Sequence, residues 1–420
     1  MVRTHVSRRR RVHAGPMDTH PTAPPRPIPG SQFDWLYREI AAWQASDLIS
    51  GDQAAAIRAG YRRVDGRRFS LGRLMLGLGG CFVGIGLIWL VAANLDELSP
   101  MLRFGVVALL WLLFLAGGEA LDARGSSRPL VGSVRLIAAL VFGAAVFQAA
   151  QSLQVPAYSP HLVGLWGAGA LVHAYAVRAV SPLLVGVAAG TVWWVWLSLW
   201  DEPSAAAAVA SIGAASVVAV SLAVVHDRGL HRFGFVWRSV GALLSLVALF
   251  AAAVPYATTD DFAWSPWLVG ALVVAGVLAV AAVALSSGIA RLEPVSAAAV
   301  LGMAAVLVAW DTGTDTSNID AADWAHAGVS VAAYVLVAVG VAALGIVRDN
   351  PVLTLLAMLG LVVFTTFQSF AVFAAIIQGA WLFVVLGLVF LATGFLFDRA
   401  RRGLADVLDT DSANPEGDAR

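Results

Sequence analysis

Glutamine side chains recur at every third position near the end of one apolar segment, at Gln148, Gln151 and Gln154. A spacing of three residues places the first two on one face of a helix. An amide group within hydrocarbon requires a hydrogen-bond partner, which a neighbouring helix or a bound ligand can supply. Two interpretations therefore stay open for Gln148 and Gln151: hydrogen bonding between helices, or the border of a ligand pocket.

Tryptophan is abundant, and most of its 15 residues fall at the ends of apolar segments that the charge pattern described below places outside. Aromatic belts at the membrane interface explain many of these positions. Belts normally occupy both interfaces, so the excess on one side also favours an outward-facing cavity with aromatic walls. With the two signals combined, the predicted ligand-binding residues are Gln148, Gln151, Gln368, Trp196 and Trp200.

Other patterns that can carry chemistry are weak. The glycine-rich stretch at 77–86 lies in an apolar run, where small residues serve close helix packing, whereas a nucleotide-binding loop follows a strand. The acidic pair Asp96 and Glu97 resembles the outer acids of enzymes that use lipid-linked sugars, but its loop is short for such a donor. The aspartates in 311–323 lack the ligand spacing of a calcium loop. The sequence therefore predicts no catalytic residue, no metal site and no cofactor.

Ionisable side chains deep in a bilayer mark ion or proton paths. Glu119, Arg135 and Asp311 fall near the ends of apolar runs, which leaves His173 as the deepest titratable group. A lone histidine is more often a hydrogen-bonded packing residue than a proton relay. The sequence therefore does not favour proton-coupled transport.

The composition requires a bilayer as solvent. Of the 420 residues, 59% are hydrophobic and 13% are charged, whereas a typical soluble domain has about a quarter charged residues. A helix of about 20 residues crosses the hydrocarbon core, and the apolar runs have this length. Twelve runs are expected to span the membrane, at 71–93, 102–121, 130–150, 161–178, 182–200, 204–225, 235–254, 265–285, 294–310, 327–347, 351–369 and 376–397.

The predicted fold is an all-α polytopic membrane protein with about twelve transmembrane helices over 71–397. Residues 1–30 are rich in Arg and Pro and predict a disordered tail. Residues 31–68 predict a small cytoplasmic helical hairpin, whose second helix opens with a capping box at Ser50. Residues 398–420 are polar and predict a second disordered tail.

Charge and cysteine content narrow the cellular setting. The net charge is zero, which gives no reason to expect a nucleic-acid partner. All 27 basic residues are arginine, a bias typical of GC-rich bacterial genes. The single cysteine, Cys81, predicts neither an internal disulfide nor a thiolate metal cluster. No apolar segment follows the arginines of 8–11 until Leu71, so a signal peptide is not expected.

Charges in the loops predict the orientation, because cytoplasmic loops retain Lys and Arg. Arginines precede the first run, occupy the even-numbered loops and follow the last run, at Arg67, Arg68, Arg73, Arg124, Arg128, Arg178, Arg228, Arg232, Arg291, Arg348 and Arg399. The odd-numbered loops hold acids instead, with only Arg103 against the trend, at Asp96, Glu97, Asp201, Glu202, Asp260, Asp261, Asp311, Asp315, Asp320 and Asp323. We therefore expect a bacterial inner-membrane protein with both termini in the cytoplasm.

A set of residues in the first half of the chain carries a family resemblance. Its members are Trp43, Ser50, Gln53, Tyr61, Asn94, Gln148, Gln151, Tyr158 and Trp166, with the glycine-rich stretches 76–80 and 84–88. On these residues the segment 31–200 resembles a bacterial family of multi-pass predicted membrane proteins, domain of unknown function 2157. The resemblance implies an envelope membrane protein and supports the topology, and it implies no particular activity.

The leading functional hypothesis is a non-enzymatic membrane protein that binds or moves a lipidic or uncharged small molecule through an outward-facing site. Its expected partners are membrane lipids, with residues 31–68 as a docking element for a cytoplasmic or membrane protein. Two alternatives stay open. One is an integral membrane enzyme that acts on a lipid-linked substrate through the outer acids, and the other is a scaffold or sensor without a small-molecule ligand.

Overall fold

The computed structural model describes residues 26–64, 71–94, 99–156, 158–254, 257–259, 261–310 and 321–368, and three isolated positions beyond them. The chain divides into two compact units, Met1–Met75 and Leu76–Arg420. We call them the hairpin unit and the membrane unit, and each is treated by itself.

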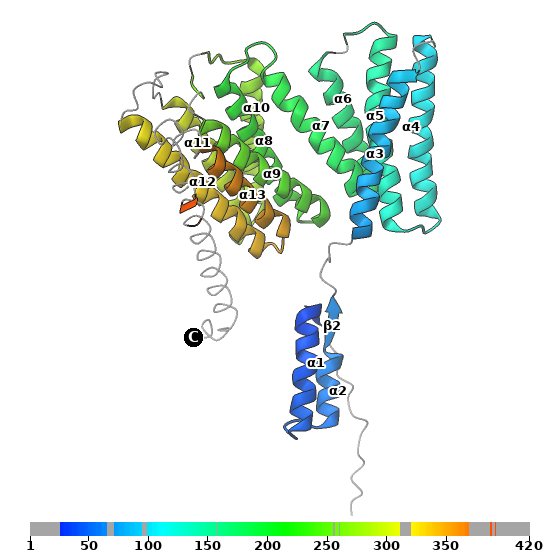
Figure 1. Ribbon diagram of the computed structural model, residues 1–420, viewed down its shortest axis with the longest axis vertical. Helices are drawn as coiled ribbons and strands as arrows, with labels where there is room; N and C mark the ends of the chain where they lie inside the picture. The colour runs from blue at the N-terminus through cyan, green and yellow to red at the C-terminus, as the bar shows by residue number, and fades with distance from the viewer. Residues whose placement is uncertain are drawn as a thin grey trace, which may run out of the picture. The chain divides into compact units, whose positions relative to one another are not determined.

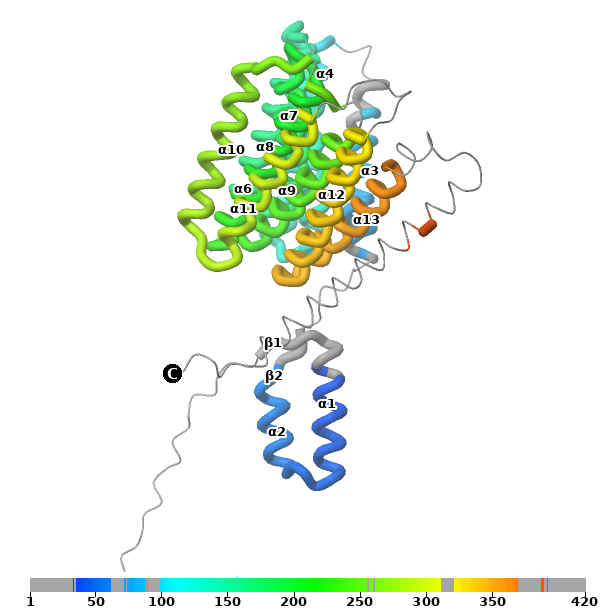
Figure 2. The backbone as a smooth tube through the Cα atoms, turned by 90° about the vertical axis from the view of Figure 1, so that its left-hand side faces the viewer, coloured from blue at the N-terminus to red at the C-terminus, as the bar shows by residue number. Residues whose placement is uncertain are grey.

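The hairpin unit contains two helices, α1 (Gly30–Ala45) and α2 (Gly51–Ala59), which lie antiparallel in Figure 2. The expected capping box is confirmed, because the Ser50 hydroxyl accepts from the Gln53 amide and the Gln53 side chain accepts from the Ser50 amide. Only Ile40 and Ala54 are fully buried among the described side chains of this unit. This small core is typical of so short a segment.

One feature of the hairpin unit differs from the expectation. The short strand β1 (Arg26–Pro29) lies in the segment expected to be a disordered tail, and it pairs in parallel with β2 (Tyr61–Val64). Proline lacks the amide hydrogen that a central strand needs, but an edge strand tolerates it. In a two-stranded sheet both strands are edges, so the prolines of β1 do not prevent pairing. Residues 1–25 and 398–420 lie outside the described residues.

The membrane unit consists of long helices in the part that the structure describes. They are α3 (Leu71–Asn94), α4 (Pro100–Ala123), α5 (Arg128–Ser152), α6 (Pro160–Val177), α7 (Val180–Ser198), α8 (Ala205–His226), α9 (His231–Ala252), α10 (Pro266–Leu285), η1 (Gly288–Arg291), α11 (Leu292–Ala309), α12 (Ala321–Val347) and α13 (Pro351–Gln368). Proline begins α4, α6, α10 and α13, because the first turn of a helix needs no amide hydrogen.

The membrane helices confirm the predicted fold class. Nine helices among the described residues are long and apolar enough to cross a membrane. The helices α3 and α6 occupy two more of the expected positions. The twelfth expected run, 376–397, lies almost entirely outside the described residues. The chain is therefore a polytopic α-helical membrane protein.

The membrane helices pack mainly as antiparallel hairpins, α4 with α5, α6 with α7 and α8 with α9 (Figure 1). The helix α8 also packs against α10 and α11, and α13 packs against α12 and α9. Two groups result, α4–α7 and α8–α13, which meet mainly where α7 contacts α8 and α9. A cavity lies at this junction.

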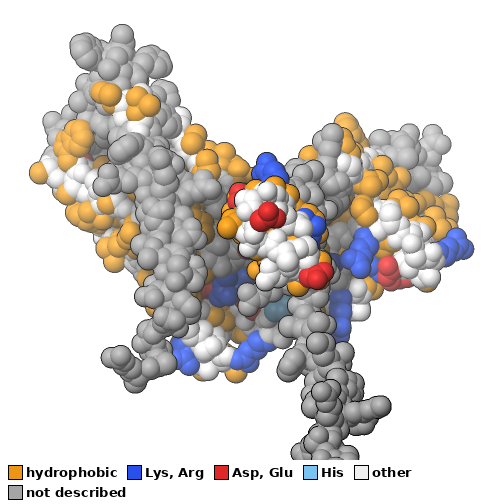
Figure 3. Space-filling model, turned by 90° about the horizontal axis from the view of Figure 1, so that it is seen from below, with side chains coloured by type: hydrophobic (Ala, Val, Ile, Leu, Met, Phe, Trp, Pro, Cys, Tyr) orange, Lys and Arg blue, Asp and Glu red, His pale blue; other side chains and the backbone are white. Residues whose placement is uncertain are grey.

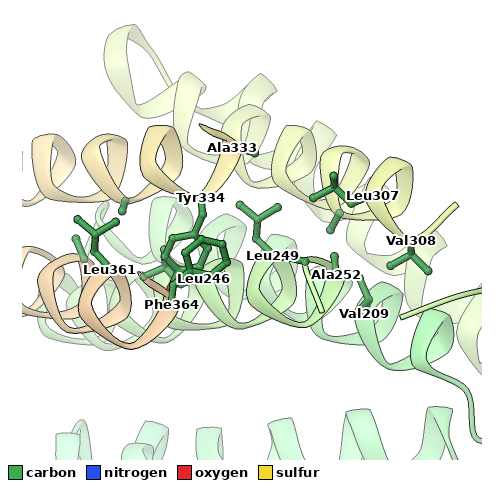
Figure 4. Close-up of a cluster of buried hydrophobic side chains, with 14 of the residues drawn as sticks. Val209, Leu246, Leu249, Ala252, Leu307, Val308, Ala333, Tyr334, Leu361 and Phe364 are labelled. Carbon is green, nitrogen blue, oxygen red and sulfur yellow. The ribbon is translucent and has the colours of Figure 1, made fainter. Parts of the chain in front are cut away.

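The largest buried cluster holds α9, α12 and α13 together (Figure 4). Tyr334 of α12 stacks on Phe364 of α13, with ring centroids 3.9 Å apart and planes 3° from parallel. Leu246 and Leu249 of α9 belong to the same cluster. Lipid tails are as apolar as these side chains, so close van der Waals packing holds such helices together.

Candidate functional site

A cavity of about 510 Å³ lies between the α6–α7 hairpin and the α8–α9 hairpin. Its lining contains Trp193 and Trp194 of α7 and Trp237 of α9, and we call it the tryptophan cavity. Among the described residues, His161 and Thr191 are the others in its lining with polar side-chain groups, and no Asp, Glu or Arg lines it. Such a lining suits an apolar or uncharged molecule that presents flat faces to the indole rings.

The tryptophan cavity extends along the helices. On α6 its lining runs from His161 to Leu171, which corresponds to about 15 Å at 1.5 Å per residue. On α7 it runs from Gly186 to Trp194. It therefore begins near the first turn of α6 and reaches beyond the middle of both helices.

Hydrogen bonds fix one wall of the tryptophan cavity. The Trp194 indole donates to the Ser211 carbonyl at 3.1 Å, and the Trp267 indole donates to the Trp194 carbonyl at 3.3 Å. The Ser198 and Ser211 hydroxyls lie 2.8 Å apart across the same helix interface. The Trp267 ring lies edge-on to Trp193, with centroids 5.0 Å apart. The rings are thus held in place before any ligand binds.

A hydrogen-bonded chain holds Trp237 at the other end of the cavity. The Trp237 indole donates to the Tyr175 hydroxyl at 3.2 Å, and this hydroxyl lies 2.9 Å from Nε2 of His226. Nδ1 of His226 lies 2.6 Å from the Leu222 carbonyl, which only accepts, so Nδ1 carries the proton. Nε2 then accepts from Tyr175. The chain joins α6, α8 and α9 beneath the cavity.

Glycines bring α6 and α7 together and open the space beside them. A Cβ on Gly167 would lie 2.9 Å from the Gly190 nitrogen, so the two backbones are in contact there. A Cβ on Gly190 would meet nothing within 4 Å. Because Gly190 lines the cavity, its missing side chain contributes to the open volume.

The structure brings two of the five predicted site residues together. Trp196 and Trp200 lie with ring centroids 6.1 Å apart, and Tyr158 contacts both, at 5.0 Å and 5.7 Å. This aromatic cluster lies at the end of α7, and neither tryptophan lines the tryptophan cavity.

The three predicted glutamines are divided between the two helix groups. Gln148 is half-buried and Gln151 exposed on α5, which packs against α4, α6 and α7. Gln368 is 5% exposed on α13, which packs against α12 and α9. Its Oε1 is buried and has no hydrogen-bond partner among the described residues. A ligand-binding role for the glutamines, or for Trp196 and Trp200, stays a prediction.

The sequence did not single out Trp193 or Trp194 and placed Trp237 at the inner face without a role. Trp193 shares a helix face with Trp196 and Trp200 at three- and seven-residue spacing, so the signal was available. The sequence does not show which helix lies opposite each indole ring.

Ionisable residues form two clusters at helix ends that sequence reasoning described only as isolated groups. In the first, Arg135 of α5 pairs with Glu119 at 2.6 Å and with Asp122 at 2.9 Å. Nε2 of His173 lies 3.8 Å from Glu119. This nitrogen is buried and makes no hydrogen bond to the described residues, so the hydrogen-bonded packing role expected for His173 stays a prediction.

The second cluster joins α8, α9, α11 and the end of α12. Arg238 binds Asp227 at 2.5 Å and Glu293 at 2.7 Å. Arg348 donates to Glu293 through Nε at 2.7 Å and also through Nη2. The Glu293 side chain is 2% exposed, so these two arginines, and not water, are the main partners of its carboxylate. Figure 3 shows basic side chains dispersed among apolar ones on the face that it presents.

The outer acids show no metal-binding geometry in the part of the chain that the structure describes, where no group of three His, Cys, Asp or Glu residues could hold an ion. Asp201, Glu202 and Asp261 are exposed. Asp96, Glu97 and the segment 311–320 lie outside the described residues, so their roles stay predictions.

Comparison with known proteins gives one match. No curated protein and no solved structure matches the chain. A family model described as "Predicted membrane protein (DUF2157)" matches residues 41–183, a segment that includes the hairpin helix α2, the membrane helices α3–α6 and the first cluster of ionisable residues. The resemblance read from the sequence is therefore confirmed over residues 41–183, which match this family of predicted membrane proteins.

Proposed function

We propose that this protein binds a lipidic or uncharged apolar molecule in the tryptophan cavity and exchanges it with the outer side of a bacterial plasma membrane. The observation that carries the proposal is an indole-lined space of about 510 Å³ with no Asp, Glu or Arg among the described residues of its lining. Small-molecule sites typically have volumes of about 300–1,000 Å³ and mainly apolar walls. The hairpin unit serves in this proposal as a docking element for a protein partner.

The position of the cavity supports movement of the ligand as well as binding. It lies at the junction of the α4–α7 and α8–α13 groups, which share few contacts there compared with the contacts inside each hairpin. In many transporters the substrate lies between two helix groups that rock against each other. A small displacement of one group would change access to Trp193 and Trp194.

The proposed orientation places both termini in the cytoplasm. It rests on the alternation of arginine-bearing and acid-bearing loops. It is supported by the Asp227, Arg238, Glu293 and Arg348 cluster, because this cluster joins the ends of α8, α11 and α12 that the alternation assigns to one side. The first turn of α6, where the cavity begins, is then at the outer side.

Cysteine labelling tests the orientation. In a Cys81→Ala background, Ser50→Cys and Ser287→Cys are expected to resist a membrane-impermeant thiol reagent in intact cells, and Glu202→Cys is expected to react. All three positions are exposed, so the reagent reaches each of them once the membrane is opened. Labelling of position 50 or 287 in intact cells, or protection of position 202, would contradict the orientation.

Filling the cavity tests the binding proposal. Gly190→Leu projects a side chain into space where nothing lies within 4 Å, so stability should change little while the cavity loses volume. With the purified full chain in lipid nanodiscs, we expect saturable photolabelling of α6–α9 by a neutral long-chain alcohol bearing a diazirine. Gly190→Leu should reduce the saturable labelling at least tenfold, as measured by mass spectrometry of the labelled peptides.

The matched control is Gly276→Leu on α10, where a Cβ also meets nothing within 4 Å and the residue does not line the cavity. It should label like the parent protein. Equal saturable labelling of the Gly190→Leu and Gly276→Leu variants would refute binding in the tryptophan cavity and favour the scaffold alternative. Loss of function on replacement of an outer aspartate by Asn, with labelling unchanged, would favour the enzyme.

A further inference from the structure

A second cavity, of about 530 Å³, lies between α11 and α12. The helix α9 closes it on the side that faces the protein interior. The helices α11 and α12 make few contacts with each other, and the cavity fills the space between them. Its lining is apolar along most of its length, with residues such as Val300, Met303 and Val337. We call it the α11–α12 slot.

The α11–α12 slot is long and faces the bilayer. On α12 its lining runs from Ala333 to Val347, about 21 Å at 1.5 Å per residue. Half of a hydrocarbon core is about 15 Å deep. Leu336, which lines the slot, is 73% exposed, and Leu292 and Ile289 at its charged end are also exposed. The slot is thus long enough to cross the hydrocarbon half of one lipid leaflet and is accessible from that leaflet.

One end of the slot is charged. Arg238 and Glu293 line it there, and Arg348 binds Glu293 directly after the slot residue Val347. The two arginines and the two carboxylates of this cluster, Asp227 included, balance in charge.

Arg291 adds one positive charge at this end. It is exposed, lies between the slot residues Ile289 and Leu292, and donates to the Ser286 carbonyl at 2.7 Å. It forms no ion pair within the described residues. Arg291 therefore presents a positive charge outside this balanced cluster, at the place where the slot opens.

We propose that the α11–α12 slot binds one chain of an anionic phospholipid, with the phosphate at Arg291 and the exposed edge of Arg348. The acyl chain lies along α12 against Val337 and the other apolar residues of the slot. Basic pockets between transmembrane helices at the cytoplasmic side bind anionic headgroups through such arginines. A zwitterionic lipid gains the same chain contacts without the charge complementarity, so the positive charge of Arg291 favours the anionic lipid. This site is separate from the tryptophan cavity and does not depend on the function proposed for it.

The test uses the full chain purified in detergent and the probes phosphatidylglycerol and phosphatidylcholine with identical acyl chains. Native mass spectrometry counts the retained lipid, and we expect one phosphatidylglycerol retained in strong preference to phosphatidylcholine. Gly340→Leu places a side chain in the slot, because a Cβ at Gly340 meets nothing within 4 Å. It should abolish retention of both lipids. Arg291→Gln should reduce the preference for phosphatidylglycerol about fivefold and leave phosphatidylcholine unchanged.

Two matched controls separate slot effects from general ones. Gly276→Leu adds the same side chain outside the slot, and Arg124→Gln removes an exposed arginine near the end of α4. Both should retain lipid like the parent protein. Unchanged retention in Gly340→Leu, an equal effect of Arg124→Gln and Arg291→Gln, or conversion of the lipid-free protein to a dimer that lipid does not dissociate would overturn the proposal. Gly190→Leu should leave retention unchanged, so failure here and failure of the tryptophan cavity are distinguishable.

Discussion

Glu293→Gln is expected to destabilise the membrane unit by about 3–5 kcal/mol, because the substitution removes one partner of a buried ion pair. Glu293 is 2% exposed and accepts hydrogen bonds from Arg238 and Arg348. The neutral amide leaves two arginines sharing the single carboxylate of Asp227, which lies 3.8 Å from Arg348. Thermal unfolding of the purified protein in detergent measures the loss as a lower midpoint.

The control for this prediction is Glu202→Gln, which neutralises an exposed carboxylate in the loop after α7 and should shift the midpoint little. A double-mutant cycle with Arg238→Gln isolates the pair, since residues in one ionic network are not additive. We expect the double variant to be less destabilised than the sum of the two single variants. Additive losses would show that Arg238 and Glu293 stabilise the fold independently, contrary to the prediction.

The sequence predicts the membrane architecture well, for a physical reason. Each transmembrane helix satisfies its own backbone hydrogen bonds, so a long apolar run is sufficient to specify it. The runs at 71–93 and 235–254 correspond to α3 and α9 within a few residues at each end. Prolines and the serine before several of them also mark where helices begin, as Ser99 and Pro100 do for α4. These signals are local, and local signals can be read from one sequence.

Contacts between helices could not be read in this way. Arg135 and Glu119 were visible near helix ends, but their pairing needs α4 and α5 to be in register. The tryptophans posed the same difficulty, because helical spacing shows on which face of its helix a tryptophan lies but not which other helix its ring contacts. Trp193 is fixed against Trp267, a residue far along the chain on α10. The predicted set that combined Gln148 with Gln368 drew on residues of similar depth, and depth alone does not place two helices side by side.

The contact between Gly167 and Gly190 leads to the second large effect. Gly167→Ala is expected to destabilise the α6–α7 hairpin by about 1–3 kcal/mol, because its Cβ would lie 2.9 Å from the nitrogen and 3.2 Å from the Cα of Gly190. These atoms are backbone and cannot rotate away, so the helices must separate. Thermal unfolding in detergent should show a lower midpoint, and saturable photolabelling of the tryptophan cavity should weaken because Trp193 and Trp194 move with α7.

The matched control is the other glycine of the same contact. Gly190→Ala adds an identical methyl group, but there a Cβ meets nothing within 4 Å. Its free energy of unfolding should stay within about 1 kcal/mol of that of the parent protein, with the higher helix propensity of alanine acting in its favour. The two variants have the same composition and differ only in which helix carries the methyl group. Equal destabilisation by both would mean that glycine flexibility, and not the backbone contact, matters at this crossing. A stable Gly167→Ala protein would mean that the backbones of α6 and α7 are not in contact there. The wall of the tryptophan cavity that these two helices form would then differ from the one described.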